Sequence, residues 1–272
     1  MLKRLLHYCF NLMVFTILMS FDAEAFSRNS VDEFLSHRAF YKMSTIKVAS
    51  SSPIVNVEGR LSFELREFCD SWTVEQSYIM VYQRDNGSEK QINTFLSSWE
   101  QKEGNNYKFF VKRENSDAGT TFIEGTAIMP QINGEGTVDF EKPESKQFTL
   151  DKKTLFPSKH TLALINAAKR KQKIFQSFIF DGTEVEPSVL VSSIIGPQKT
   201  FNGDVVELEK GQYWPIRMAF FSPAEKQIEP EYEITINLHS NGVVSALILD
   251  YGDIIIDVEL VELNFLEHSF CK

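Results

Sequence analysis

The feature that most constrains the fold of this chain is an alternation of side-chain polarity. Over residues 57–65, odd positions carry apolar side chains or glycine, and even positions carry charged or hydroxyl side chains. Similar rows run through residues 72–82, 232–238 and 254–260. Successive side chains of a strand point to opposite faces of a sheet, so each row predicts a β-strand with one buried and one solvated face.

Turn signals separate these rows. Asn-Gly or Asp-Gly pairs stand at residues 86–87, 133–134, 181–182, 202–203 and 241–242. Such pairs adopt the positive φ angles of tight hairpins, and with the rows they predict about 12 to 14 strands in meander order. A sheet of that many strands must curl or close, because long flat edges aggregate. The predicted fold class is mainly β: a single curled or incompletely closed antiparallel β-barrel.

One mid-chain segment, residues 155–169, lacks the alternation and favours a helix. Ser158 is expected to be its N-cap, Ala-rich spacing follows, and the basic residues 169–173 suit its C-terminus. A helix in this place is expected to cover or plug one opening of the curled sheet. The chain has no linker rich in Pro, Gly or Ser and no internal repeat, so a single domain is predicted over residues 26–272.

The first 25 residues have the three parts of a secretory leader. Lys3 and Arg4 precede a mostly apolar run over residues 8–21, and small residues follow at Ala23 and Ala25. A transmembrane anchor is the alternative, but the run of about 14 residues falls short of the roughly 20 that span a bilayer. The sequence therefore predicts cleavage after Ala25, export, and no membrane anchor in the mature chain.

Two cysteines, Cys69 and Cys271, remain after the predicted cleavage. In an oxidising compartment an even pair favours a disulfide. The alternative is a reactive thiol, which the neighbouring carboxylate of Asp70 would oppose by disfavouring the thiolate. The disulfide is the preferred interpretation.

The composition and motifs argue against several classes of function. The formal net charge is −9 and no basic face is evident, so a nucleic-acid partner is not expected. No nucleophile elbow, zinc helix, P-loop or dinucleotide fingerprint occurs, and His37, His160, His239 and His268 do not stand at metal-ligand spacing. The prediction is a protein that is not an enzyme and uses no metal or cofactor.

Aromatic residues offer two interpretations. They either fill a packed core, or they line a groove for an apolar ligand such as an acyl chain, since large barrels leave interior space. The residues predicted to line such a cleft are Phe63, Tyr78, Phe109, Phe178 and Trp214.

Five segments stand out together: residues 37–41, 58–63, 68–72, 155–161 and 249–253, with Cys271 at the end. In this order they resemble the EipB-type periplasmic proteins, a cell-envelope integrity family of alphaproteobacteria. The ordered set covers nearly the whole mature chain. The positions that carry the resemblance, and are expected to have structural roles, are His37, Arg38, Tyr41, Gly59, Arg60, Trp72, Pro157, His160, Thr161, Asp250, Tyr251 and Gly252.

The resemblance implies a spiral-like, incompletely closed β-barrel around a kinked helix, with a disulfide between an early and a C-terminal cysteine. It also implies a periplasmic location and a shape similar to that of lipoprotein carriers. The leading hypothesis is a non-enzymatic periplasmic protein that supports envelope integrity through another periplasmic envelope protein, an apolar cleft, or both. The alternative is a lipid or lipoprotein carrier that binds acyl chains.

Overall fold

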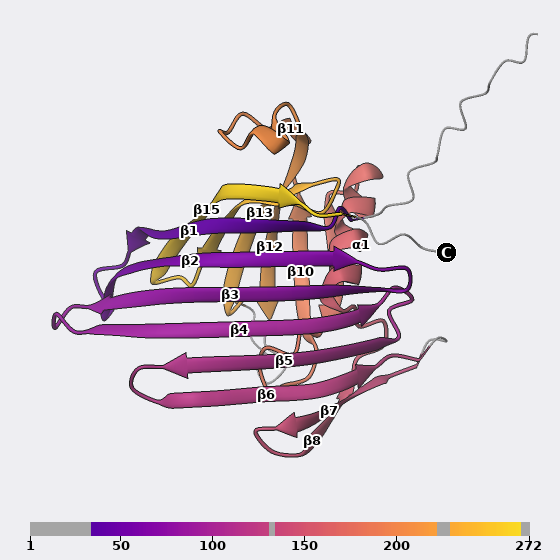
Figure 1. Cartoon of the computed structure of the whole chain (residues 1–272), viewed down its shortest axis with the longest axis horizontal. Coiled ribbons are helices and arrows are strands. Elements are labelled where there is room, and N and C mark those ends of the chain that lie inside the picture. The colour runs from indigo at the N-terminus through magenta and orange to yellow at the C-terminus, as the bar shows by residue number, and fades with distance from the viewer. Residues whose placement is uncertain (1–33, 131–133, 222–228, 268–272) are drawn as a thin grey trace, which may run out of the picture. The chain divides into compact units, whose positions relative to one another are not determined.

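One antiparallel sheet of 15 strands dominates this computed structural model, which describes residues 34–130, 134–221 and 229–267 (Figure 1). All of these residues fall within one compact unit, Asp32–Lys272. The strands are β1 His37–Val48, β2 Ile54–Glu67, β3 Ser71–Arg84, β4 Glu89–Gln101, β5 Asn106–Asn115, β6 Gly119–Ile128, β7 Gly136–Lys142, β8 Lys146–Leu150, β9 Ile174–Ile179, β10 Val189–Ile195, β11 Lys199–Thr200, β12 Gln212–Phe221, β13 Tyr232–His239, β14 Val244–Asp250 and β15 Ile254–Phe265. The helices are α1 Pro157–Lys169 and the short 3₁₀ helix η1 Val206–Leu208.

The sheet is a meander that does not close. Its order runs from β8 back to β1, then to β15, and from there back through β14, β13, β12 and β10 to β9. The first and last strands are therefore neighbours, while β8 and β9, which flank α1 in the sequence, form the two edges. A single parallel bridge joins Leu155, just before α1, to Ile179 at the end of β9. The expected incompletely closed barrel is confirmed, with 15 strands rather than about 12 to 14.

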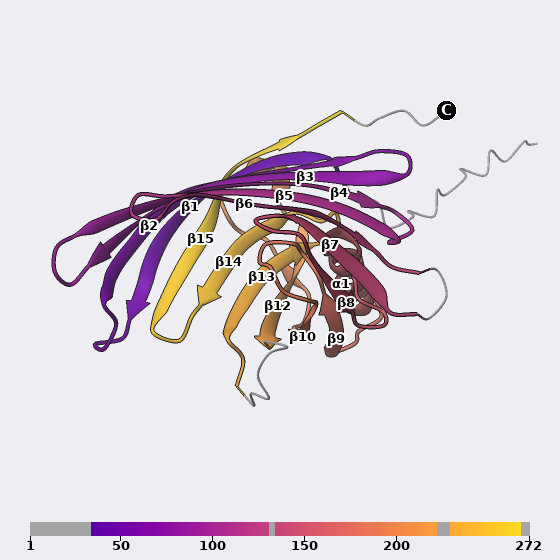
Figure 2. The same ribbon diagram turned by 90° about the horizontal axis from the view of Figure 1, so that it is seen from below.

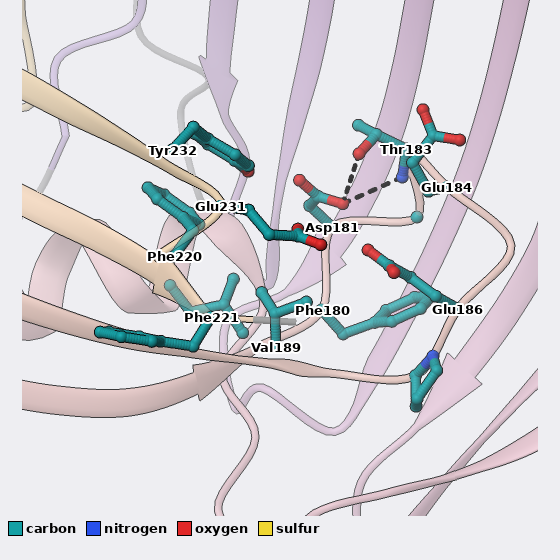
Figure 3. A pocket seen from close by; sticks show the side chains of 13 residues that line it. Phe180, Asp181, Thr183, Glu184, Glu186, Val189, Phe220, Phe221, Glu231 and Tyr232 are labelled. Carbon is teal, nitrogen blue, oxygen red and sulfur yellow. Dashed lines mark hydrogen bonds between the residues drawn. The ribbon is translucent and has the colours of Figure 1, made fainter. Parts of the chain in front are cut away.

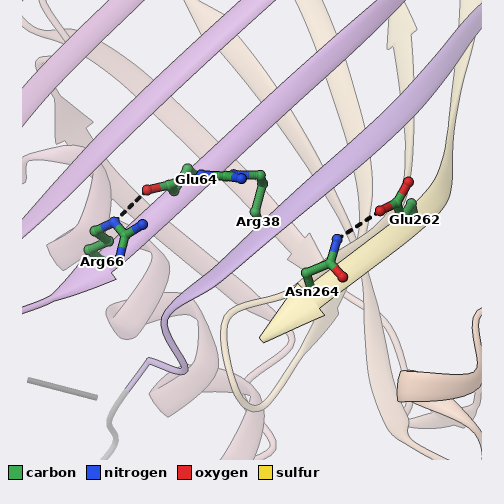
Figure 4. Close-up of polar contacts among 5 residues, drawn as sticks. All are labelled: Arg38, Glu64, Arg66, Glu262 and Asn264. Atoms are coloured by element: carbon green, nitrogen blue, oxygen red, sulfur yellow. Dashed lines mark hydrogen bonds and ion pairs between the residues drawn. The ribbon is translucent and has the colours of Figure 1, made fainter. Parts of the chain in front are cut away.

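The alternation seen in the sequence maps onto the two faces of the sheet. In β1, Ala39, Tyr41 and Met43 are buried, whereas Arg38 and Lys42 are exposed. On the outer face, the Arg38 guanidinium contacts Glu64 of β2 (Figure 4). The predicted rows at residues 57–65, 72–82, 232–238 and 254–260 all lie within strands, namely β2, β3, β13 and β15.

The predicted tight turns are only partly correct. Gly87 (φ 79°) and Gly242 (φ 88°) form the turns of the β3–β4 and β13–β14 hairpins, as expected. The pair at 181–182 instead begins the long loop between β9 and β10. Gly203 lies in the long connection of the antiparallel β11–β12 pair, before η1, and not in a tight turn. In the remaining pair, residues 133–134, Asn133 lies outside the described residues.

Helix α1 lies between two halves of the same sheet, one formed by β1–β8 and the other by β9–β15 (Figure 2). Its buried residues include Leu164, Ile165 and Ala168, and they belong to a core cluster that contains Trp72 of β3 and Ile216 of β12. Because this cluster draws apolar side chains from both halves, the helix fills the space that curling leaves. This arrangement matches the expected plug. Along the described ranges of the chain, no helix combines the length and the hydrophobicity of a membrane span.

The start of α1 differs from the prediction. Phe156, with an extended backbone, is the N-cap, and Pro157 occupies the first turn, where its missing N–H and fixed φ are favourable. No side chain of the helix itself caps this end. Ser158 is therefore not the N-cap, and its backbone N–H is satisfied from a distant strand, as the next subsection describes.

Candidate functional site

A buried carboxylate holds the N-terminus of α1. Glu100 of β4 is 2 % exposed, and it accepts hydrogen bonds from the backbone N–H groups of Ser158 (2.7 Å) and Lys159 (2.8 Å). Burial raises the pKa of Glu100 to about 7, although these two hydrogen bonds oppose the rise. The carboxylate thus occupies the anion site that a helix N-terminus provides. Its role here is to fix the helix, and both oxygens are already engaged.

Burial affects three histidines in the same way, by lowering the pKa of each imidazole. Burial lowers the pKa of His160 on α1 to about 4, lowers that of His239 to about 4, and also lowers that of His37. His239 Nε2 lies 2.9 Å from the Ser245 hydroxyl, and His37 Nδ1 lies 2.6 Å from the Leu35 carbonyl. All three rings are therefore neutral at pH 7. His268 lies outside the described residues.

No metal centre emerges from the described part of the chain. It holds no group of three His, Cys, Asp or Glu side chains that is suited to bind a metal ion. His160 packs against Phe175, with ring centroids 6.1 Å apart, and its Nε2 has no hydrogen-bond partner within the described residues. The histidine belongs to the packing of the helix.

A hollow lies at the C-terminal end of α1, and we call it the α1 cleft. Its volume is about 890 Å³. Ala168 of α1, Ile195 of β10 and Trp214 of β12 are buried and form its apolar base. The exposed lining residues form its rim: Lys169, Lys171, Gln172, Lys173, Pro197, Gln198 and Ser240, with the half-buried Gly196 beside them.

Local helix termination explains why lysines border this cleft. The last helical residue is Lys169, and the N–H groups of Lys171 and Gln172 donate back to the carbonyls of Ala168 and Ala167 at 2.9 and 3.0 Å. Lys171 has a φ of 58°, the left-handed conformation that commonly ends a helix. The chain then turns into β9, so the basic run stays at the rim.

A smaller hollow of about 200 Å³ lies at the other ends of β9, β10 and β12, and we call it the acidic pocket (Figure 3). The Phe220 and Tyr232 rings stack at 4.5 Å on one side of it. Glu184 pairs with Arg113 at 2.9 Å, whereas burial and the neighbouring carboxylates raise the pKa of Glu186. The residues that line it are Ile179, Phe180, Asp181, Gly182, Thr183, Glu184, Glu186, Pro187, Val189, Phe220, Phe221, Glu231 and Tyr232.

The five residues predicted to line one apolar cleft do not converge. Trp214 alone lines the α1 cleft. Phe109 is buried in a separate core cluster with β5–β8 residues, and Phe63 packs between two clusters. Tyr78 and Phe178 are half-buried on β3 and β9, outside both hollows. Of the five, Trp214 lies at the base of a cleft, and the apolar-ligand interpretation stays a prediction.

The family-motif residues of β1 and β2 have structural surroundings. The Tyr41 hydroxyl donates to the Val244 carbonyl at 2.8 Å, tying β1 to β14. A Cβ at Gly59 would lie 2.5 Å from a backbone oxygen of β3, so glycine permits close strand packing. Arg60 is exposed on β2, and Arg38 pairs with Glu64 on the outer face.

The later motif residues form turns and a helix start. Pro157 begins α1, and the Thr161 hydroxyl donates to the Pro157 carbonyl at 3.0 Å. Asp250 accepts a hydrogen bond from the N–H of Gly252 (2.9 Å), whose φ of 83° suits glycine. Tyr251, between them, is exposed.

The predicted disulfide remains a prediction. Cys69 lies in the exposed turn between β2 and β3, and Cys271 lies outside the described residues. Residues 1–25, the predicted leader, also lie outside them.

Sequence reasoning missed Glu100 and the α1 cleft. The sequence does contain an indication of Glu100. It stands at an even position of β4, on the face that also buries Thr94 and Ser98. A charge on that face indicates a buried partner. The cleft had no comparable signal, because α1, β10 and β12 meet only in the folded chain.

Comparisons with known proteins agree on one relationship. The family model described as EipB-like matches residues 28–267. The chain is 28 % identical over 253 residues to the cell envelope integrity protein EipB of Brucella abortus (strain 2308), covering 90 % of this chain and 89 % of that protein. A crystal structure of a β-barrel-like protein of a domain of unknown function from Brucella abortus is similar in fold. Its TM-score is 0.80 at 25 % identity, over 86 % of this chain and 99 % of that one.

Proposed function

Because the chain belongs to the EipB-like family, we propose that it supports the integrity of the cell envelope, and that it does so by binding rather than by catalysis. The relative from Brucella abortus is named a cell envelope integrity protein, and the resemblance to it extends over most of both chains. We place the protein in the periplasm on the support of the predicted leader at residues 1–25.

The observation that carries the proposal is the α1 cleft. Its volume of about 890 Å³ falls within the roughly 300–1,000 Å³ of small-molecule sites, which are mostly apolar with a few polar groups. Trp214 is 7 % exposed at its base, beside Ile195 and Ala168. An aromatic and two aliphatic side chains under a polar rim suit an acyl chain. We therefore take an acyl-bearing molecule as the ligand, which is also what a lipid or lipoprotein carrier would hold.

Binding rather than catalysis fits the placement of the buried titratable groups. Glu100 is engaged by two helix N–H groups, and His239 lies beside the Ser245 hydroxyl. His160 faces a ring on β9. None of these three side chains lines the α1 cleft, so none of them can serve as a general acid or base for a ligand bound there.

Complementation of a deletion strain tests the proposal. The strain should become more sensitive to detergents and cell-wall antibiotics, and the wild-type gene should restore resistance. Gln198→Trp, which places an indole at the mouth of the cleft, should fail to restore it at equal protein level. Glu207→Trp is the matched control, because Glu207 is exposed on η1 outside the cleft. Unchanged sensitivity on deletion, or full rescue by Gln198→Trp, would contradict the proposal.

A further inference from the structure

The rim of the α1 cleft has the opposite charge to the protein. The chain has a formal net charge of −9, yet the cleft lining contains three lysines, Lys169, Lys171 and Lys173, and no acidic residue. A local patch of one sign attracts ligands of the other sign even when the net charge opposes it. The cleft therefore favours an anionic ligand.

Two of these three lysines make no ion pair within the described residues. Lys171 and Lys173 are exposed and have no ion-pair partner within the described residues. By contrast, Lys102 pairs with Glu67 at 2.7 Å, and Lys142 pairs with Glu124 at 2.6 Å. A lysine in the last turn of a helix is favourable for the helix dipole, which accounts for Lys169. Lys171 and Lys173 lie beyond the last helical residue, where the dipole effect weakens, and their ammonium groups remain available to a ligand.

Base and rim together define the chemistry of the occupant. The buried Trp214, Ile195 and Ala168 supply an apolar surface directly beneath the cationic rim. An ammonium group on a flexible stem contacts a phosphate as a point charge and does not demand one fixed geometry. A molecule with an acyl chain and a phosphate-bearing head satisfies both parts of the cleft.

We infer that the α1 cleft binds an anionic phospholipid, with an acyl chain over Trp214 and the headgroup phosphate at Lys171 and Lys173. This inference rests on the proposed function, which requires only an acyl ligand and does not specify its charge. It adds a preference for negative headgroups and names the residues that provide it.

Calorimetric titration of the mature protein, residues 26–272, tests the inference with soluble short-chain lipids. The probes are dihexanoyl-phosphatidylglycerol, which is anionic, dihexanoyl-phosphatidylcholine, which is zwitterionic, and inorganic phosphate. We expect the anionic lipid to bind about tenfold more tightly than the zwitterionic one, and phosphate alone to bind more weakly than either. Added salt should reduce the difference.

Two double variants test whether the preference for the anionic lipid comes from Lys171 and Lys173. Lys171→Gln with Lys173→Gln should lose most of the tenfold difference while still binding the zwitterionic lipid. Lys152→Gln with Lys153→Gln is the control, because both lysines are exposed, lie before the other end of α1, and include a residue of similar backbone (φ 66° at Lys153, 58° at Lys171). Circular dichroism spectra check that each variant is folded.

The outcomes separate the two proposals. Equal affinity for both lipids in the wild type overturns the inference and leaves the proposed acyl binding intact. The same holds if the control pair loses the preference as fully as the cleft pair. Binding of neither lipid contradicts the proposed function itself. Phosphate binding as tight as that of the anionic lipid overturns the placement of an acyl chain over Trp214.

Discussion

Glu100 Oε2 accepts a hydrogen bond from the backbone N–H of Ser158 at 2.7 Å, across 58 residues of sequence. The contact joins β4 in one half of the curled sheet to the helix that connects the two sheet edges. The second oxygen accepts from Lys159 at 2.8 Å, so one buried side chain satisfies two of the free N–H groups of the helix start. This cap holds the N-terminal end of α1, and the α1 cleft lies at the other end of the same helix.

Loss of the cap should destabilise the protein. In Glu100→Ala, two N–H groups would lose their acceptors in a buried setting, at about 1–3 kcal/mol each. Release of a carboxylate from burial offsets part of this, so we expect a net loss of about 2 kcal/mol in the free energy of unfolding. Urea denaturation measures it. Glu103→Ala, at an exposed position just after β4, is the control. A loss no larger than in the control would mean that the cap is dispensable.

Acid should destabilise the fold through His160. Its pKa is about 4 in the folded state against 6.5 ordinarily, so the unfolded chain binds the proton more tightly. The contribution of neutral His160 to stability is complete above pH 6.5 and is lost as the pH falls towards 4. The full effect is at most about 3 kcal/mol. In chemical denaturation at several pH values, His160→Leu should flatten the fall in stability over this window. An unchanged slope would contradict the assignment.

The acidic pocket should be a source of instability at neutral pH. Burial, together with the charges of Glu231, Asp181 and Glu184, raises the pKa of Glu186. The folded state therefore disfavours the charged carboxylate, and this penalty develops as the pH rises above the ordinary value. Glu186→Gln should raise the melting temperature at pH 7.5 and change it little at pH 4. The same substitution at exposed Glu207 should have no effect at either pH. A lower melting temperature for Glu186→Gln at pH 7.5 would overturn this account.

The predicted bond between Cys69 and Cys271 should stabilise the mature protein. Closing a loop of about 200 residues restricts the unfolded chain by as much as roughly 5 kcal/mol in the entropy model, and measured values are smaller. Cys69→Ser should therefore lower the melting temperature by several degrees, and reductant should lower that of the wild type equally. A melting temperature that neither change affects would show that the two cysteines are not bonded.

Much of the fold could be predicted because its signals are local. Alternation identified β2, β3, β13 and β15 from the positions of residues two apart, and the Ala-rich segment identified α1. Local signals failed where a contact depends on distant residues. Serine is a common N-cap residue, but α1 begins two residues earlier than Ser158 would place it, with Phe156 as the N-cap and Pro157 in the first turn. Glu100 of β4 accepts the hydrogen bond from the Ser158 N–H.

The candidate site was less predictable for the same reason. Of the five residues that the sequence places in one cleft, Trp214 lines the α1 cleft and the other four lie outside it. The cleft forms only where the end of α1 meets β10 and β12, and no spacing in the sequence encodes that meeting. The basic residues at 169–173 indicate a helix end, which the structure confirms, but that they also border a cleft follows only from the fold.

Native mass spectrometry of the mature protein, purified from its own envelope without detergent, most directly tests whether the α1 cleft holds an acyl ligand. The account predicts a bound species with the mass of one acyl-bearing lipid in the wild type and in Glu207→Trp, and its loss in Gln198→Trp. Wild-type protein that is unliganded in repeated preparations would contradict the account, as would an adduct that persists undiminished in Gln198→Trp.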